Sequence, residues 1–167
     1  MPVSAIGISH HLVALDDLAL LSRASDAVLA RLDAADLVGV VLLGTCNRFE
    51  VYFESASFHA GLESVLAAVR DALPAAARGM VDAFEVYAGT GAVQHLIEVA
   101  SGLDSMVVGE AEIIGQVREA LTRSGDRASA ALHRLFHAAL TTAKAVSSQT
   151  ALGAAGRSIA QVGLGLV

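Results

Sequence analysis

The stretch that decides the fold runs from residue 38 to residue 53 and reads VGVVLLGTCNRFEVYF. Its first part, Val38–Leu43, is continuously apolar, which is typical of a central strand covered on both faces. From Phe49 onward, apolar residues alternate with more polar ones, the period of a half-buried strand. Because only about five residues separate the two runs, we predict an antiparallel hairpin with Cys46, the only cysteine, at its tip.

The segments around this hairpin complete the order β-α-β-β-α-β, which is the split motif of ferredoxin-like folds. We therefore predict an α+β protein, with a ferredoxin-like catalytic core over residues 1–88 and a helical extension over residues 89–167. The core elements are strands at 3–9, 38–43, 49–54 and 84–87 and helices at about 25–35 and 58–73. The extension is expected to have helices at 90–100, 110–124 and 132–146 and a last one from about residue 157 to the end.

Composition and charge narrow the class of protein. The chain has 167 residues, 54% of them hydrophobic, and a formal net charge of −6. This charge argues against a broad, sequence-independent nucleic-acid surface but allows a local contact with an RNA end. We find no signal peptide and no apolar run of the roughly 20 residues that span a bilayer. The lone cysteine cannot form an internal disulfide, so we expect a soluble, cytoplasmic protein with a reduced thiol.

Cys46 has two interpretations. A single cysteine in an apolar protein is commonly inert packing, but Cys46 lies in a polar turn, between Thr45 on one side and Asn47 and Arg48 on the other. A nearby guanidinium would favour the thiolate, which is the nucleophilic form. Arg48 itself is either a solvated strand residue or a bidentate clamp for a substrate carboxylate. We favour a nucleophilic Cys46.

Three other features are candidates for chemistry. His95 points away from the apolar face of its predicted helix, so it is either a surface histidine or a proton-transfer partner. His133 and His137 have the i, i+4 spacing of metal ligands but no third ligand nearby, and we expect no metal site. Glu112 and Gln116 are i, i+4 neighbours beside an apolar stripe. Glu110 projects towards the centre of that stripe, either as a first-turn residue or as a polar group in a cleft.

Two motifs resemble those of glutamyl-tRNA reductases. The first is LGTCNRFEVY at residues 43–52, and the second runs from His95-Leu96 through VASGLDSMVVGE at residues 99–110 to Gly115-Gln116-Val117. The residues GISH at 7–10, Leu135-Phe136 and Ala143-Lys144 fit the same family. The resemblance covers essentially the whole chain, and the second motif is long and specific.

The resemblance implies an oxidoreductase that reduces glutamyl-tRNA with NADPH to glutamate-1-semialdehyde, the first step towards 5-aminolevulinate, tetrapyrroles and porphyrins. Cys46 would expel tRNA and hold glutamate as a thioester, and His95 matches the family histidine important for activity. Arg48 would hold the glutamate carboxylate. The remaining positions that match substrate or tRNA-end contacts are Thr45, Asn47, Ser105, Glu110, Ala111, Glu112 and Gln116.

The sequence also departs from the family pattern. Gly44 replaces the Ser-like residue before Thr45, Glu112 stands where Gln is common, and residues 11–17 lack the usual basic and Thr-Ala-Pro features. We find neither the dinucleotide-binding domain nor the C-terminal helices of the family homodimer, so no NADPH-binding residue is expected in this chain. We therefore expect the N-terminal catalytic domain of a longer enzyme. The alternatives are a thiol-dependent glutamyl-tRNA esterase and a non-catalytic regulatory relative.

Overall fold

The computed structural model describes residues 3–105 and 112–149. The predicted helix from residue 157 and the predicted site residues Glu110 and Ala111 lie outside these ranges. The strands are β1 Ser4–Ser9, β2 Gly39–Gly44, β3 Arg48–Glu54 and β4 Glu85–Ala88. The α-helices are α1 Leu15–Arg23, α2 Ser25–Leu32, α3 Phe58–Ala72, α4 Thr90–Ala100, α5 Glu112–Ser124 and α6 Ala130–Gln149, with 3-10 helices η1 Ala75–Ala83 and η2 Gly125–Arg127.

The four strands form one sheet in the order β2-β3-β1-β4, and every neighbouring pair is antiparallel. The chain order is therefore β-αα-ββ-α-β, the predicted split motif with a second helix in the first crossover. This arrangement confirms the α+β prediction. The β2–β3 pair is the predicted hairpin, and its last rung joins Gly44 to Phe49. Cys46 consequently lies in the turn.

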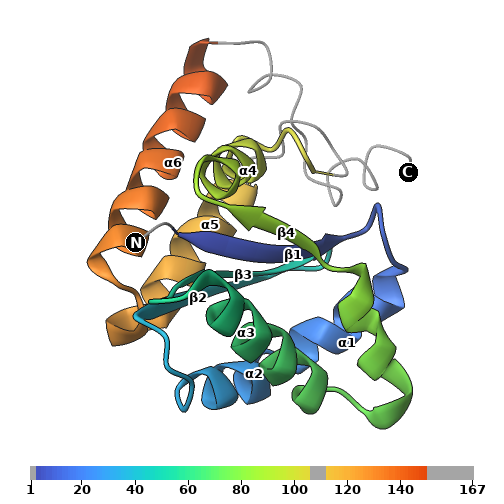
Figure 1. The fold of residues 1–167 in the computed structure, drawn as a ribbon. Coiled ribbons are helices and arrows are strands. Elements are labelled where there is room, and N and C mark those ends of the chain that lie inside the picture. Colours follow the sequence, from blue (N-terminus) through green and yellow to red (C-terminus); the bar gives the residue numbers. More distant parts are fainter. Residues whose placement is uncertain (1–2, 106–111, 150–167) are drawn as a thin grey trace, which may run out of the picture.

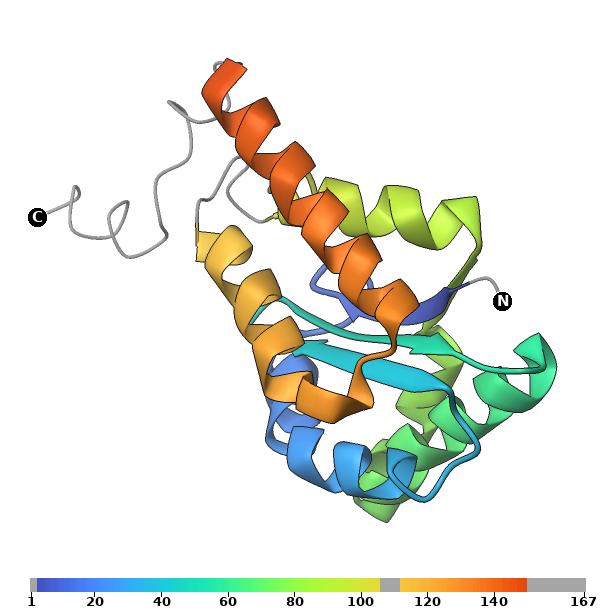
Figure 2. The same ribbon diagram turned by 90° about the vertical axis from the view of Figure 1, so that its left-hand side faces the viewer.

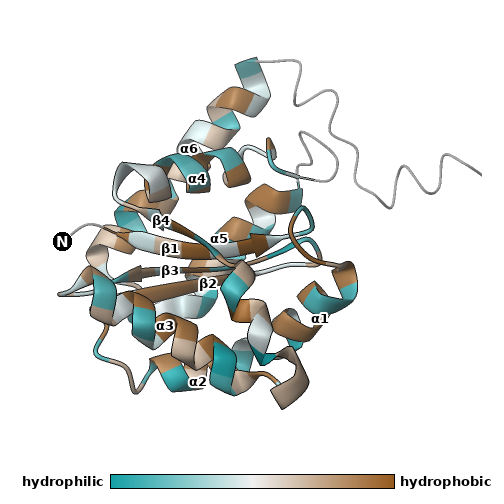
Figure 3. Ribbon diagram, turned by 45° about the vertical axis from the view of Figure 1, so that its right-hand side comes forward, coloured by the Kyte–Doolittle hydropathy of each residue, from teal (hydrophilic) through white to brown (hydrophobic). Residues whose placement is uncertain are grey.

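The molecule has three layers, with helices on both faces of the sheet (Figure 1). Successive residues of a strand point to opposite faces, so each inner strand supplies two cores. Phe49, Val51 and Phe53 of β3 belong to the core under α1–α3. Tyr52 of the same strand belongs to the core under α4–α6. The hydrophobic faces of the helices are turned towards the sheet from both sides (Figure 3).

Two details of the strand predictions are overturned by the structure. Strand β2 is an edge strand of the sheet, not a central one. It is nevertheless buried on both faces, because α5 and α6 cover one face and α2 lies on the other. Strand β3 is buried along its whole length instead of half-buried. The helices α4–α6 share one hydrophobic core with the sheet, while the predicted domain boundary at residue 88 stays a prediction.

Two local features position the neighbouring segments. Gly102, with φ of 71°, ends α4 as predicted, and the amide of Leu103 donates to the Glu98 carbonyl. Gly39 lets the segment before α6 approach β2, since a Cβ there would lie 2.5 Å from the Ser129 amide nitrogen. None of the helices in the described ranges is long and apolar enough to cross a membrane.

Candidate active site

The turn that carries Cys46 is held by the residue before it. The Thr45 amide donates to the Arg48 carbonyl over 2.9 Å, and Thr45 Oγ1 accepts from the amides of Asn47 and Arg48 at 3.1 and 3.2 Å. The Asn47 carbonyl in turn accepts from the His10 amide at 3.0 Å, which ties the turn to the end of β1. The backbone is therefore fixed, whereas the Cys46 side chain is exposed. An exposed thiol on an ordered turn is accessible to a large substrate.

Arg48 is not the solvated strand residue of one of our two interpretations, because only 1% of its side chain is exposed. Its Nη1 donates to Glu50 Oε1 at 2.8 Å, and its Nη2 donates to Asp104 Oδ2 at 3.0 Å and to the Asp104 carbonyl. Burial by itself lowers the pKa of Arg48, but the two carboxylates outweigh it and raise that pKa above its ordinary value. The guanidinium charge is thus compensated inside the protein. A substrate carboxylate can reach Nη2 only by replacing Asp104.

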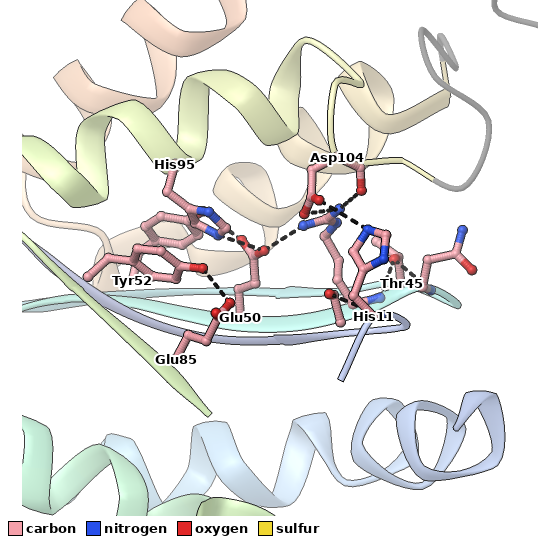
Figure 4. Close-up of polar contacts among 11 residues, drawn as sticks. His11, Thr45, Glu50, Tyr52, Glu85, His95 and Asp104 are labelled. Atoms are coloured by element: carbon pink, nitrogen blue, oxygen red, sulfur yellow. Dashed lines mark hydrogen bonds and ion pairs between the residues drawn. The ribbon is translucent and has the colours of Figure 1, made fainter. Parts of the chain in front are cut away.

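Glu50 lies at the centre of a polar network between the sheet and α4 (Figure 4). Its Oε1 contacts Arg48 and lies 3.0 Å from His95 Nε2, while its Oε2 accepts from Tyr52 at 2.6 Å. The carboxylate is 2% exposed. Burial alone raises the pKa of Glu50, but the contacts with His95, Arg48 and Tyr52 outweigh it and hold that pKa below its ordinary value. The carboxylate is therefore ionised at neutral pH and accepts all three contacts.

His95 is largely buried instead of on the surface, with 11% of its side chain exposed. Its ring stacks on Tyr87 of β4, with centroids 3.9 Å apart and planes at 10°. Because Nε2 faces the ionised Glu50, the tautomer that has its hydrogen on Nε2 donates to this carboxylate and leaves Nδ1 outside that contact. The surface interpretation of His95 was wrong because this side of α4 packs on β4, and the His95 ring contacts Glu50 and Tyr52 of β3.

The sequence prediction missed three members of this network. Glu50 and Tyr52 were assigned to the polar side of a half-buried strand and, like Asp104, were quoted as part of a family motif without a role of their own. One signal was present in the sequence. Arg48, Glu50 and Tyr52 are spaced i, i+2, i+4 and so share one face of the strand. Asp104 has no such signal, since it meets Arg48 across 56 residues of sequence.

A cavity of about 510 Å³ lies beside the network. Its lining includes the His95 ring and three carboxylates, which belong to Glu85, Glu98 and Asp104. His11 also lines the cavity, and its Nε2 lies 3.3 Å from Asp104 Oδ1. The cavity can therefore hold a small polar group, and its acidic lining favours one that carries a positive charge.

The predicted site residues are only partly brought together. Thr45, Asn47, Arg48 and His95 lie around the turn and the polar network. Ser105 directly follows Asp104 and is partly exposed. Gln116 lines a separate hollow with the end of β2, from Leu42 to Gly44, next to the turn. Glu112 is exposed in the first turn of α5.

The described residues do not fit a nicotinamide dinucleotide. Such a cofactor binds at a glycine-rich turn between a strand and a helix in a parallel sheet, and this sheet is antiparallel throughout. We therefore assign no cofactor contact to residues 3–105 or 112–149. Within these ranges there is also no group of three or more His, Cys, Asp or Glu side chains that could hold a metal ion.

Comparisons with known proteins point to one family. The model of the family "Glutamyl-tRNAGlu reductase, N-terminal domain" matches residues 6–150. Glutamyl-tRNA reductases of Micrococcus luteus and Salinispora arenicola are 44% and 37% identical to the chain. Each match covers 99% of this chain and 38% of the relative's length. A solved structure, glutamyl-tRNA reductase from Methanopyrus kandleri, superposes with a TM-score of 0.71 at 32% identity. The superposed region covers 89% of this chain and 35% of the Methanopyrus kandleri protein.

Proposed function

The chain belongs to the glutamyl-tRNA reductase family, whose N-terminal domain it matches, and from this premise we propose that it performs the acyl-transfer half of that reaction. The Cys46 thiolate attacks the ester carbonyl of glutamyl-tRNA, a C–S bond forms, and the C–O bond to the terminal ribose breaks. The ribose oxygen leaves with a proton as free tRNA. Glutamate stays on Cys46 as a thioester.

The observation that carries the proposal is the exposed Cys46 thiol on a turn fixed by Thr45. Cys46 lies two residues after the end of β2 and two residues before Arg48 of the Arg48–Glu50–His95 network. A fixed backbone limits the positions of the sulfur, which favours a productive approach to the ester. We propose that His95, oriented by Glu50 and Tyr87, exchanges the proton at Nδ1. We propose Arg48 as the group that binds the substrate carboxylate, in place of Asp104.

Further residues complete the proposed site. Thr45 holds the turn, Asn47 is part of the turn, and Gln116 lines the hollow at the end of β2. From the family pattern we propose Ser105, Glu110, Ala111 and Glu112 as additional contacts for the substrate or for the tRNA end. The carboxylates of Glu85 and Glu98 in the neighbouring cavity suit the α-ammonium group of the glutamyl residue.

Reduction of the thioester to glutamate-1-semialdehyde needs a hydride donor, which we infer from the family to be NADPH. The chain spans about 38% of the length of its curated relatives, and we assign the hydride step to none of its described residues. The homodimer and the cytoplasmic location that the family implies likewise stay predictions, as does the place of this reaction at the start of tetrapyrrole synthesis.

The test is transfer of radiolabelled glutamate from glutamyl-tRNA to the protein. We expect the wild-type chain to become labelled at one glutamate per chain and to lose the label to neutral hydroxylamine, as a thioester does. Cys46→Ser should give no hydroxylamine-sensitive label, while its far-UV circular dichroism should match the wild type because the side chain is exposed. Equal hydroxylamine-sensitive labelling of the variant would refute the assignment of the nucleophile.

The exposure of Cys46 also favours a second activity, thiol-dependent hydrolysis. A thioester at an exposed sulfur is open to water, which would release free glutamate. Product analysis separates the two outcomes, because free glutamate that accumulates over many turnovers without NADPH identifies an esterase. A single turnover that stops at the labelled protein identifies the acyl-transfer half of a reductase.

A further inference from the structure

A second large cavity lies away from the network, in the groove between α5 and α6. Its volume is about 490 Å³, and its lining includes Arg118 of α5, His133, His137 and Lys144 of α6, and Asp126 of the connecting η2. Figure 2 shows α5 and α6 side by side, joined at η2. We call these five residues and the space between them the α5–α6 groove.

The α5–α6 groove is basic in an otherwise acidic protein. The chain carries a net charge of −6, yet residues 112–149 contain five arginines and lysines against three acidic residues. Lys144 is the only lysine of the sequence. Positive charge is therefore concentrated in the part of the chain that forms this groove.

Within the described part of the chain, the two cations of the groove form no ion pair. Arg118 and Lys144 are exposed, and neither has an acidic partner among residues 3–105 and 112–149. Other arginines are paired: Arg127 lies 2.5 Å from Asp33, and Arg48 contacts Glu50 and Asp104. Among the described residues, the only carboxylate in the groove lining is that of Asp126, at the η2 end. An anion in the groove would therefore meet two uncompensated charges.

The spacing of the groove residues suits an extended anion. His133, His137 and Lys144 follow one another at four and seven residues, so they form a row along one face of α6. This row is about 16 Å long at 1.5 Å per residue. In double-stranded DNA, adjacent phosphates of one strand are about 3.4 Å apart along the axis, and the spacing in an RNA helix is of the same order. The row can therefore follow several phosphates of one strand, with Arg118 on the opposite wall.

The groove also lies close to the end of the hairpin that carries Cys46. Helix α5 lines the groove through Arg118, whereas its Gln116 and Arg123 line the hollow at Leu42–Gly44, just before the turn. One helix, about 10–12 Å across with its side chains, thus separates the groove from this hollow. A rigid RNA whose end reaches the turn can lie across α5.

We propose that the α5–α6 groove binds backbone phosphates of the tRNA whose aminoacyl end is delivered to Cys46. This inference rests on the proposed function, because it takes the substrate from it. Arg118 and Lys144 are the phosphate contacts, and His133 and His137 donate hydrogen bonds along the same row. The groove contributes affinity and orientation for the RNA and takes no part in the chemistry at Cys46.

Binding of uncharged glutamate tRNA, followed by fluorescence anisotropy at several KCl concentrations, tests the proposal. The groove variant is Arg118→Gln with Lys144→Gln. Its matched control is Arg23→Gln with Arg70→Gln, which makes the same charge change at exposed sites on α1 and α3, in the opposite layer. Each phosphate contact contributes about 0.9 to the slope of log affinity against log salt for B-DNA and about 0.7 for single strands. For two lost contacts we expect the groove variant to lose about 1.4–1.8 of this slope and the control to keep the wild-type slope.

An unchanged slope in the groove variant, or an equal loss in the control, would overturn the proposal. Absence of tRNA binding by the wild-type chain would overturn it as well. A small substrate separates this failure from a failure of the proposed function. Glutamyl-adenosine is too short to reach the groove, so the groove variant should accept glutamate from it at the wild-type rate. If the wild-type chain itself accepts glutamate from neither glutamyl-adenosine nor glutamyl-tRNA, the proposed function is wrong, and the groove proposal that rests on it is wrong too.

Discussion

Substitution of Glu50 by Gln should destabilise the protein by about 3 kcal/mol at neutral pH. Glu50 accepts contacts from Arg48, His95 and Tyr52 and is almost completely buried. Glutamine keeps the shape but has one acceptor oxygen, and its amide group would face another donor. Removal of one partner of a buried ion pair costs about 3–5 kcal/mol. The lower end applies because Arg48 keeps its contact with Asp104, whose side chain is 36% exposed.

The pH dependence of this loss follows from the direction of the pKa shift. The pKa of Glu50 is depressed in the folded protein below its ordinary value of 4.5. A carboxylate with a depressed pKa stabilises the fold above the unfolded pKa, and this contribution disappears as the pH falls through the folded pKa. The difference between wild type and Glu50→Gln should therefore be full at pH 7 and shrink below about pH 4.5.

Urea unfolding followed by far-UV circular dichroism measures both effects. In thermal unfolding, the same loss of about 3 kcal/mol would lower the Tm by roughly 6–12 °C for a chain of this size. The matched control is Glu85→Gln on β4, because Glu85 also accepts from a tyrosine, Tyr87, but is exposed. The control should change stability by less than about 1 kcal/mol. A loss in Glu50→Gln that equals the control, or one that stays constant down to pH 3, would refute the reasoning.

Three further predictions concern the site and the layers around it. Asp104→Asn should lower the KM for glutamyl-tRNA about fivefold. The change weakens by about 1 kcal/mol the contact between residue 104 and Arg48, which the substrate carboxylate must replace. A raised KM would instead make Asp104 a positioning residue. Phe136→Ala should cost about 3–5 kcal/mol in urea unfolding, since Phe136 is fully buried against Tyr52. Gly39→Ala should cost about 1–3 kcal/mol in the same assay, because its Cβ would meet the Ser129 backbone; an unchanged midpoint would show that the segment moves freely.

Local periodicity predicted most of the elements in the described ranges. The alternation after Phe49 placed β3, the continuous run before Gly44 placed β2, and the helical spacing of apolar residues placed α3 and α6. These patterns depend on which face of an element is buried, and a sequence records that directly. Helix α1 begins at Leu15 without a side-chain cap, so the sequence carries no strong signal for its start.

The position of Cys46 in the hairpin turn was likewise predictable, because a polar break between two apolar runs marks a turn. The roles of its neighbours were not. The sequence predicted Arg48 as a group for a substrate carboxylate, whereas the structure shows it engaged by two internal carboxylates. The choice between a solvated and a buried arginine depends on what covers that face of β3.

What the sequence by itself determined is the order of strands and helices, the turn at Cys46 and, through its motifs, the family. The burial of Glu50 was visible only in the tertiary structure. The same is true of the contact between His95 and Glu50 and of the contact between Asp104 and Arg48. His95 reaches Glu50 across 45 residues of sequence, and Asp104 reaches Arg48 across 56. The physical reason is that strand periodicity shows which residues share a face but not what packs on it. Helix α4 and the turn after it cover this face, remove the water and leave the charged groups to pair with one another.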